Sequence, residues 1–155
     1  MEKLRLDLKG LHEYQQNRYP YLLIDVAEEV IPGKSARGYK HLDNDWFFKC
    51  HWPGDPNMPG MLQMEALLQM CALTVLTLPD NKGKLVYVIS ANNMKFSRKI
   101  VPGDRLDIKT KLHSWKRGIG NCSGIGSVNG EIACKADFNI TMPDVLNQYK
   151  VLSSK

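Results

Sequence analysis

The stretch that decides the fold reads WFFKCHWPGDPNMPG over residues 46–60 and MLQMEALLQMCALTVLTL over residues 61–78. Three prolines, two glycines and four aromatic residues crowd the first half. Proline interrupts helices and central strands, so we expect residues 46–60 to form a long, rigid, packed loop without a regular helix or central strand. The second half is apolar around most of its circumference, which is typical of a buried helix. It predicts a central helix over about residues 59–78, with its periodic part at Met61–Leu78.

Working outward from this helix, the chain reads as short strands separated by turns. Residues 1–16 form an amphipathic entry segment whose helix or strand character stays open, and residues 142–155 have no strong period and are expected to fray. Asn129-Gly130 is the strongest hairpin signal. Strands are predicted over residues 21–30, 35–42, 85–90, 106–115, 118–128 and 131–141, and residues 95–100 lead to a turn at 101–104. This inventory predicts an α+β domain in which five or six antiparallel strands curl around one helix.

The chain's size and composition are those of a single globular domain. It has 155 residues, of which 43% are hydrophobic and 24% charged. We predict one domain over residues 1–155, with its core at about residues 10–141 and an extension at each end. No apolar run reaches the roughly 20 residues of a membrane span, and the first residues lack the apolar core of a secretory signal. We therefore expect a cytoplasmic location and no insertion into a membrane.

The cysteines and the net charge limit which ligands and partners the chain could have. The cysteines, at positions 50, 71, 122 and 134, show no metal-binding or redox spacing, so no metal site and no disulfide framework is expected. The net charge of +5 suggests an acidic partner, although a merely solvated basic surface explains it equally well. Nucleic acid is disfavoured, because there is no basic run and no aromatic residues alternate with the lysines.

Glu65 and Gln69 are the polar pair on the predicted helix that points to chemistry. They lie four residues apart and so share one helical face. A carboxylate on a buried helix is costly unless it is paired, protonated or in a cavity, and burial raises its pKa as a proton donor requires. Gln69 would orient the carboxyl group by a hydrogen bond. A structural role for Glu65, beside a buried arginine or at a subunit interface, stays an alternative.

His51 and Gly60 lie in the rigid loop that leads into the helix. The apolar neighbours of His51 favour the neutral imidazole, which is a base, although a loop-bracing role fits as well. Gly60 falls where the helix begins, and there backbone amides have no intrahelical partner and the helix dipole is positive. A carbonyl oxygen placed there would be polarised, and the missing Cβ lets a substrate approach.

Several motifs resemble one enzyme family closely. They are RYPYLLID at 18–25, FFKCHWPGDPNMPGMLQMEA at 47–66, KFSRKIVPGD at 95–104, RGI at 117–119 and VNG at 128–130. Together they resemble the FabZ-type 3-hydroxyacyl-acyl-carrier-protein dehydratases over about residues 10–141. Glu65, where the FabA-type dehydratase-isomerases have aspartate, and Gln69 favour the FabZ branch.

The resemblance implies a hot-dog fold and a dehydration of 3-hydroxyacyl thioesters to trans-2-enoyl thioesters. It implies His51 and Glu65 as the catalytic pair, supplied by different subunits of a homodimer, itself often part of a hexamer. It implies no metal and no cofactor beyond the phosphopantetheine of acyl carrier protein. The expected substrate-binding residues are Gly60, Gln69, Tyr87 and Phe96. The expected carrier-binding residues are Lys95, Arg98, Lys99 and Arg105.

The chain departs from the family pattern at three places. Asn17 stands where the family commonly has histidine, Cys50 stands where it has glycine, and the helix carries the bulkier Leu68 and Met70. These departures leave a specialised lipid or polyketide pathway open. Two other functions also stay open: a hot-dog acyl thioesterase, and a non-catalytic subunit that binds the carrier protein.

Overall fold

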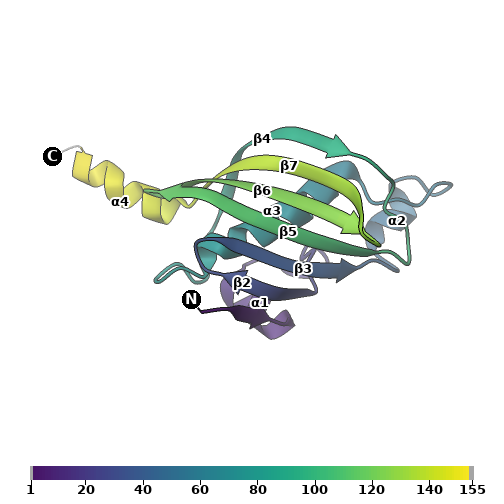
Figure 1. Ribbon diagram of the computed structural model, residues 1–155, viewed down its shortest axis with the longest axis horizontal. Coiled ribbons are helices and arrows are strands. Elements are labelled where there is room, and N and C mark those ends of the chain that lie inside the picture. Colours follow the sequence, from purple (N-terminus) through teal and green to yellow (C-terminus); the bar gives the residue numbers. More distant parts are fainter. Residues whose placement is uncertain (1, 154–155) are drawn as a thin grey trace.

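One antiparallel sheet curves around a single long helix, α3, which lies against its concave face (Figure 1). The computed structural model of the chain describes residues 2–153, with side chains for 2–150. Within that range the sheet has seven strands in the order β1-β2-β3-β5-β6-β7-β4. The strands are β1 Leu4–Leu6, β2 Val26–Ile31, β3 Ser35–His41, β4 Tyr87–Phe96, β5 Arg105–Lys116, β6 Ile119–Val128 and β7 Glu131–Thr141. This is the hot-dog architecture that the sequence predicts.

Helix α3 spans Gly60–Leu76 and is buried on most of its surface. It packs against strands β3, β5, β6 and β7. Gly124 of β6 permits the close approach, because a Cβ there would lie 3.1 Å from the Cβ of Leu67. The helix predicted from the sequence is confirmed, but it ends earlier than predicted. Thr77 terminates it, with its hydroxyl donating to the Leu73 carbonyl at 2.7 Å.

In the N-terminal half the structure settles one open prediction and corrects another. Residues 1–16 contain both a strand, β1, and a short helix, α1 Leu8–Tyr14, which Asp7 caps by accepting a hydrogen bond from the Gly10 amide. The strand predicted from residue 21 begins only at Val26. Residues 21–25 form no strand because the Gln69 side chain accepts from the Leu23 amide and donates to the Tyr21 carbonyl. These backbone groups are therefore satisfied by a side chain of α3.

The proline-rich segment contains one short helix that the sequence analysis rules out. Helix α2 spans Trp46–Cys50, ahead of the first proline at position 53. Its two buried side chains, Phe47 and Phe48, pack edge to face with ring centroids 4.7 Å apart. The rest of the segment, up to the start of α3, has no regular structure, as predicted. Proline limits helix formation only where it stands, and residues 46–50 have none.

Strand β4 joins two segments that the sequence separates, residues 85–90 and 95–100. Register shifts on both sides of Ser90–Asn92 let it follow β7 over ten residues. β4 is an edge strand, and its apolar side chains are about half exposed. These are Tyr87, Val88, Ile89, Met94 and Phe96. The other strands of this half agree with the prediction, and Asn129 and Gly130 both have the positive φ that their hairpin turn requires.

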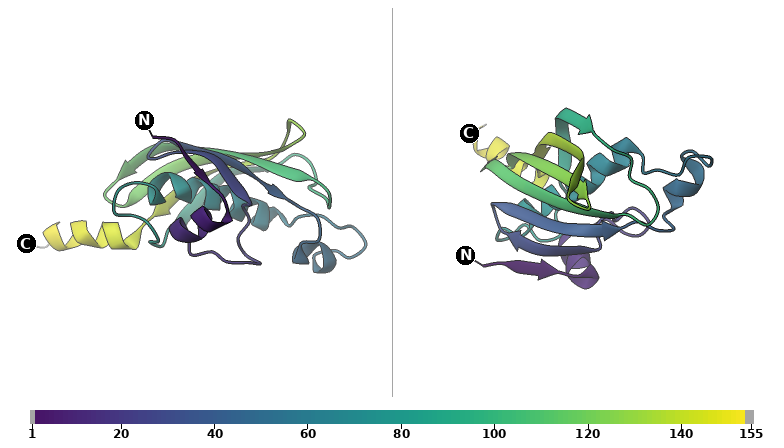
Figure 2. Two further views of the ribbon diagram at one scale, coloured as in Figure 1. Left: turned by 90° about the horizontal axis from the view of Figure 1, so that it is seen from below. Right: turned by 45° about the vertical axis from the view of Figure 1, so that its right-hand side comes forward.

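The C-terminal segment forms a helix, contrary to the prediction that it frays. Helix α4 spans Pro143–Ser153 and extends away from the sheet (Figure 2). Proline at a first helical position has its φ preset, and Asp144 lies near the positive end of the helix dipole. No helix within residues 2–153 is long and apolar enough to cross a membrane.

Candidate active site

His51 lies at the end of α2 with its imidazole fixed in one orientation. Its backbone amide donates to the Phe47 carbonyl at 2.9 Å, and its ring stacks on Trp52 with centroids 4.6 Å apart. Nδ1 lies 3.2 Å from the carbonyl oxygen of Asn57. A carbonyl oxygen only accepts hydrogen bonds, so Nδ1 carries the proton. In the neutral ring Nε2 then has a free lone pair, which is the form that a base requires.

The loop beyond His51 is held by contacts to a distant segment. The Met58 amide donates to the Ile100 carbonyl at 2.8 Å, and the Met58 side chain is fully buried. Lys99 pairs with Asp55 at 2.6 Å, and the Asp55 carbonyl accepts from the Asn57 side chain at 2.7 Å. The carbonyl that orients His51 is therefore itself immobilised.

His51 faces a cavity of about 450 Å³, here named the His51 cavity, whose lining includes His51, Gly60, Gln63, Phe96, Arg98 and Lys99. The Gly60 and Met61 amides begin α3 and have no acceptor among the described residues. They can hold a negatively charged oxygen. The absence of a side chain at Gly60 has a packing reason as well, because a Cβ there would lie 2.9 Å from the Phe96 ring.

Gln63 belongs to this cavity, although the sequence analysis does not assign it a role. Its amide nitrogen donates to the Met58 carbonyl at 3.0 Å, and its carbonyl oxygen is buried and has no partner among the residues that the structure describes. Such an atom is costly unless a ligand or water supplies a donor. Its position one turn after Gly60 on α3 is a helical spacing that could have identified it.

Glu65 is half-buried on α3, and Gln69 holds its carboxyl group. The Gln69 amide donates to Oε1 of Glu65 at 3.1 Å, and Gln69 is fixed in turn by the Tyr21 and Leu23 backbone. Burial raises the pKa of Glu65, and the Gln69 hydrogen bond offsets part of that rise. The pKa of Tyr21 is raised as well, first by burial and second by the negative charge of Glu65. The arrangement favours the protonated carboxyl group predicted for a proton donor.

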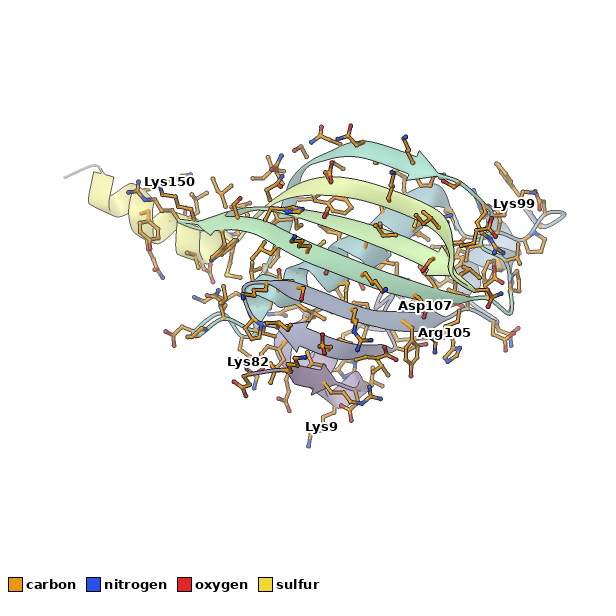
Figure 3. The ribbon with its side chains drawn as sticks, in the orientation of Figure 1. Lys9, Lys82, Lys99, Arg105, Asp107 and Lys150 are labelled. Carbon is orange, nitrogen blue, oxygen red and sulfur yellow. The ribbon has the colours of Figure 1, made fainter. Side chains whose placement is uncertain are left out.

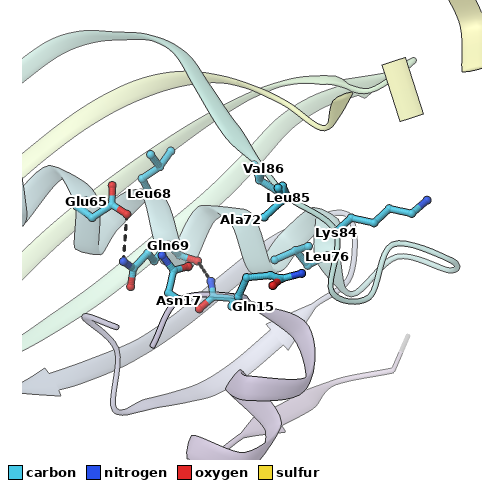
Figure 4. A pocket seen from close by; sticks show the side chains of 11 residues that line it. Gln15, Asn17, Glu65, Leu68, Gln69, Ala72, Leu76, Lys84, Leu85 and Val86 are labelled. Carbon is cyan, nitrogen blue, oxygen red and sulfur yellow. Dashed lines mark hydrogen bonds between the residues drawn. The ribbon is translucent and has the colours of Figure 1, made fainter. Parts of the chain in front are cut away.

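Glu65 faces a second cavity of about 210 Å³, here named the Glu65 cavity, which Figure 4 shows. Its lining includes Gln15, Asn17, Leu68, Gln69 and Val86. Asn17, and Leu68 but not Met70 of the helix departure, thus line the same cavity as the carboxyl group. Among the described residues the Glu65 and His51 cavities share none of their lining. A single chain therefore presents the two groups to separate spaces.

The other predicted residues fall into two groups. Phe96, Arg98 and Lys99 lie with His51, and the two cations are already paired: Arg98 with Asp104 and Glu131, Lys99 with Asp55. Tyr87, Lys95 and Arg105 line neither cavity. Tyr87 and Lys95 are exposed on β4. Arg105 binds Asp107 at 2.7 Å (Figure 3). The Arg105 guanidinium also covers the Tyr39 ring.

Cys50, the departure next to His51, has a modest local role. Its exposed thiol donates to the Trp46 carbonyl one turn earlier in α2 at 3.5 Å. The backbone there is helical, which a residue with a Cβ adopts without strain. Cys50 therefore leaves the orientation of His51 intact. The other three cysteines are buried, and burial raises the pKa of Cys134 to about 11.

The chain is similar to known proteins in sequence and in fold. The family model of the FabA-like domain matches residues 16–137. The chain is 42% identical over 136 residues to the 3-hydroxyacyl-acyl-carrier-protein dehydratase FabZ of Clostridium novyi strain NT, covering 87% of this chain and 96% of that one. It is also 42% identical over 129 residues to the FabZ of Acetivibrio thermocellus, covering 83% and 88%. Among solved structures, the dehydratase heterocomplex ApeI:P from Xenorhabdus doucetiae superposes with a TM-score of 0.76 at 15% identity, covering 92% of this chain and 96% of that one, a likeness of fold alone.

Proposed function

The chain belongs to the family of FabZ 3-hydroxyacyl-acyl-carrier-protein dehydratases and is a hydro-lyase of fatty acid biosynthesis, and we propose that two copies of it build each active site, His51 coming from one and Glu65 from the other. The substrate is a 3-hydroxyacyl group on acyl carrier protein, and the product is the 2-enoyl thioester. The thioesterase and the non-catalytic subunit are not favoured.

In the proposed reaction His51 and Glu65 act on adjacent carbons. Nε2 of His51 removes the proton at the α-carbon, and the electron pair forms the double bond to the β-carbon. The bond to the β-hydroxyl breaks as Glu65 donates its proton, so water leaves. The charge that grows on the thioester oxygen is held by the free amides at the start of α3. His51 ends protonated and Glu65 ionised, and proton exchange with solvent restores both. Both proton transfers use side chains, so the proposal needs no metal and no organic cofactor.

The single observation that carries the proposal is the separation of His51 and Glu65 into two cavities of one chain. An elimination needs acid and base on neighbouring atoms, so a second chain must supply the missing partner. The exposed edge of β4 supports this, since unpaired edges with apolar side chains are sites of strand pairing. We propose that two β4 edges pair, which makes the enzyme a homodimer. A trimer of such dimers is compatible with it.

Arg98 and Lys99 are the proposed contacts for the carrier protein. Both lie at the His51 cavity. The pairs of Arg98 with Glu131 and of Lys99 with Asp55 are exposed and weak enough to be exchanged for acidic groups or phosphate of an arriving carrier, whereas the pair of Arg98 with Asp104 is more buried. We further propose a cytoplasmic location, where acyl carrier protein would be met.

The products of the reaction test the proposed function directly. We expect 3-hydroxyacyl-acyl-carrier-protein to yield an enoyl thioester with the carrier still attached, followed by ultraviolet absorbance and mass spectrometry of the carrier. Arg98→Glu together with Lys99→Glu is expected to raise KM for the carrier-bound substrate roughly tenfold more than KM for a short pantetheine thioester, and this ratio separates carrier binding from any disturbance of the His51 loop. Release of free carrier thiol without enoyl product would instead identify a thioesterase.

The pH dependence of turnover is expected to report Glu65. Its pKa is raised above the ordinary value of 4.5, so its protonated form persists to higher pH than that of a solvated glutamate. Since only the protonated form donates, kcat/KM falls as pH rises through the raised value. Measured pH profiles of the wild type and Glu65→Gln check this: the residual activity of the variant should lack that alkaline decline. A decline of the same shape in Glu65→Gln would assign it to another group.

A further inference from the structure

We propose that the convex face of the sheet binds the surface of a membrane that contains anionic phospholipids. This face is a part of the molecule that the proposed dehydration does not use, because α3 and both cavities lie on the other side of the sheet (Figure 1). A single line of positively charged side chains crosses it from β3 to the edge strand β4.

Strand pairing places these side chains next to one another. Each of five residues lies directly opposite the next one on the neighbouring strand: Arg37 of β3, Lys109 of β5, Ile125 of β6, Lys135 of β7 and Lys95 of β4. We name these five residues the cationic row. Neighbouring strands lie about 4.8 Å apart, so the row extends over about 19 Å.

The cationic row lies on the exposed, convex side of the sheet. All five of its side chains are exposed, and successive side chains of a strand point to opposite faces. Gly124, the neighbour of Ile125, lies against Leu67 of α3. Phe96, the neighbour of Lys95, lies against the first residue of α3 and lines the His51 cavity. Ile125 and Lys95 therefore point away from the helix and from the candidate active site.

The three lysines of the cationic row are not neutralised by the protein. The ammonium groups of Lys95, Lys109 and Lys135 form no ion pair or hydrogen bond with any residue that the structure describes. Lys95 and Lys135 are directly opposite each other, and like charges in this arrangement destabilise a sheet. An external anion would remove that repulsion.

The acidic residues beside the row are already engaged. Asp107 pairs with Arg105 at 2.7 Å, and Asp137 accepts a hydrogen bond from the Asn93 side chain at 2.8 Å. Arg37 pairs with carboxylates of β2, so the uncompensated charge of the row belongs to its lysines.

These features suit an anionic bilayer better than a carrier protein or a small ligand. Lysine ammonium groups are point charges on flexible stems, which can follow the mobile phosphates of a lipid surface. Ile125 is 42% exposed in the middle of the row and supplies an apolar contact at the boundary between headgroups and acyl chains. A carrier protein bound here would have the whole sheet between itself and the two cavities.

Co-sedimentation with lipid vesicles tests the inference. The vesicles contain either phosphatidylcholine alone or equal parts of phosphatidylcholine and phosphatidylglycerol. At about 0.1 M salt we expect the wild type to partition at least about tenfold more strongly onto the anionic vesicles, and at about 1 M salt this difference should largely disappear. Lys109→Gln together with Lys135→Gln should lower the partition onto anionic vesicles roughly tenfold or more, since each lysine near such a surface contributes about fivefold.

Lys9→Gln together with Lys49→Gln is the matched control. It removes the same charge from exposed positions of α1 and α2, and it should lower the partition by no more than about twofold. In the absence of vesicles, the Lys109→Gln and Lys135→Gln double variant should form enoyl product within about twofold of the wild-type rate, as is usual for surface changes. Failure of the membrane inference is thereby distinguished from failure of the proposed function.

Three results would overturn the inference. The first is a wild type that partitions equally onto both kinds of vesicle or onto neither. The second is an equal loss in the control pair, which would assign binding to the net charge and not to the row. The third uses soluble poly-glutamate as a probe for an acidic protein: if the row lysines are needed to bind poly-glutamate but not vesicles, the row serves a protein partner.

Discussion

His51→Ala is expected to lower kcat/KM for carrier-bound 3-hydroxyacyl substrates by about 10²–10⁴-fold, the usual contribution of one acid–base group. The reason is that Nε2 of the Asn57-oriented ring takes the α-proton, and alanine has no group to replace it. The measurement is enoyl formation under conditions where substrate is below KM. His51 is only half-buried, so the variant should fold, which circular dichroism and a thermal melt can check.

His113→Ala is the matched control for this loss. His113 is exposed on β5, where Nε2 lies 2.8 Å from the Ser123 hydroxyl, and it faces neither of the two cavities. Its replacement should leave kcat/KM within about twofold of the wild type, as is usual for surface changes of well under 1 kcal/mol. A loss smaller than about tenfold in His51→Ala would remove His51 from the proposed mechanism.

Mixing two inactive variants is expected to restore activity. In a pair formed from His51→Ala and Glu65→Gln chains, one site receives both altered residues and the other receives both native ones. With random pairing about half of the dimers are mixed and half of their sites are native, so activity should return to about one quarter of the wild-type value. The experiment unfolds both variants together, refolds them and measures enoyl formation.

Each variant refolded with itself provides the control and should stay at its own low level. Glu65→Gln is chosen because the amide keeps the shape of the side chain next to Gln69. Recovery to no more than the mean of the two single variants would mean that His51 and Glu65 act within one chain. The two-chain site would then be abandoned, while the family membership would stand.

The sequence predicts most of the fold where local and global requirements agree. Helix α3 is found because it is apolar around most of its circumference, and the β6–β7 hairpin because Asn129 and Gly130 suit its turn. Residues 21–25 mislead, because their backbone groups bond to Gln69, a residue 46 positions beyond Leu23. Helix α4 is missed because a helix that lies largely outside the core needs no apolar period.

Part of the candidate site can likewise be predicted from the sequence, and part of it cannot. His51, Gly60 and Glu65 stand out in the sequence because a rigid loop enters a buried helix there, and the resemblance assigns their roles. The tautomer of His51 and the unpartnered carbonyls of Gln15 and Gln63 depend on contacts between distant segments. No periodicity encodes those contacts. The carrier-binding role of Arg105 stays a prediction from its charge; in the structure its guanidinium contacts Asp107 and Tyr39 and lines neither cavity.

The exposed edge of β4 implies that a newly folded single chain is inactive. On the proposed arrangement, folding alone yields an inert protein, and chemistry begins only when a second copy covers that edge. Turnover per molecule should therefore collapse on dilution below the dissociation constant of the pair. Any modification of β4 that prevents this pairing would abolish activity, although His51 and Glu65 themselves stay unchanged.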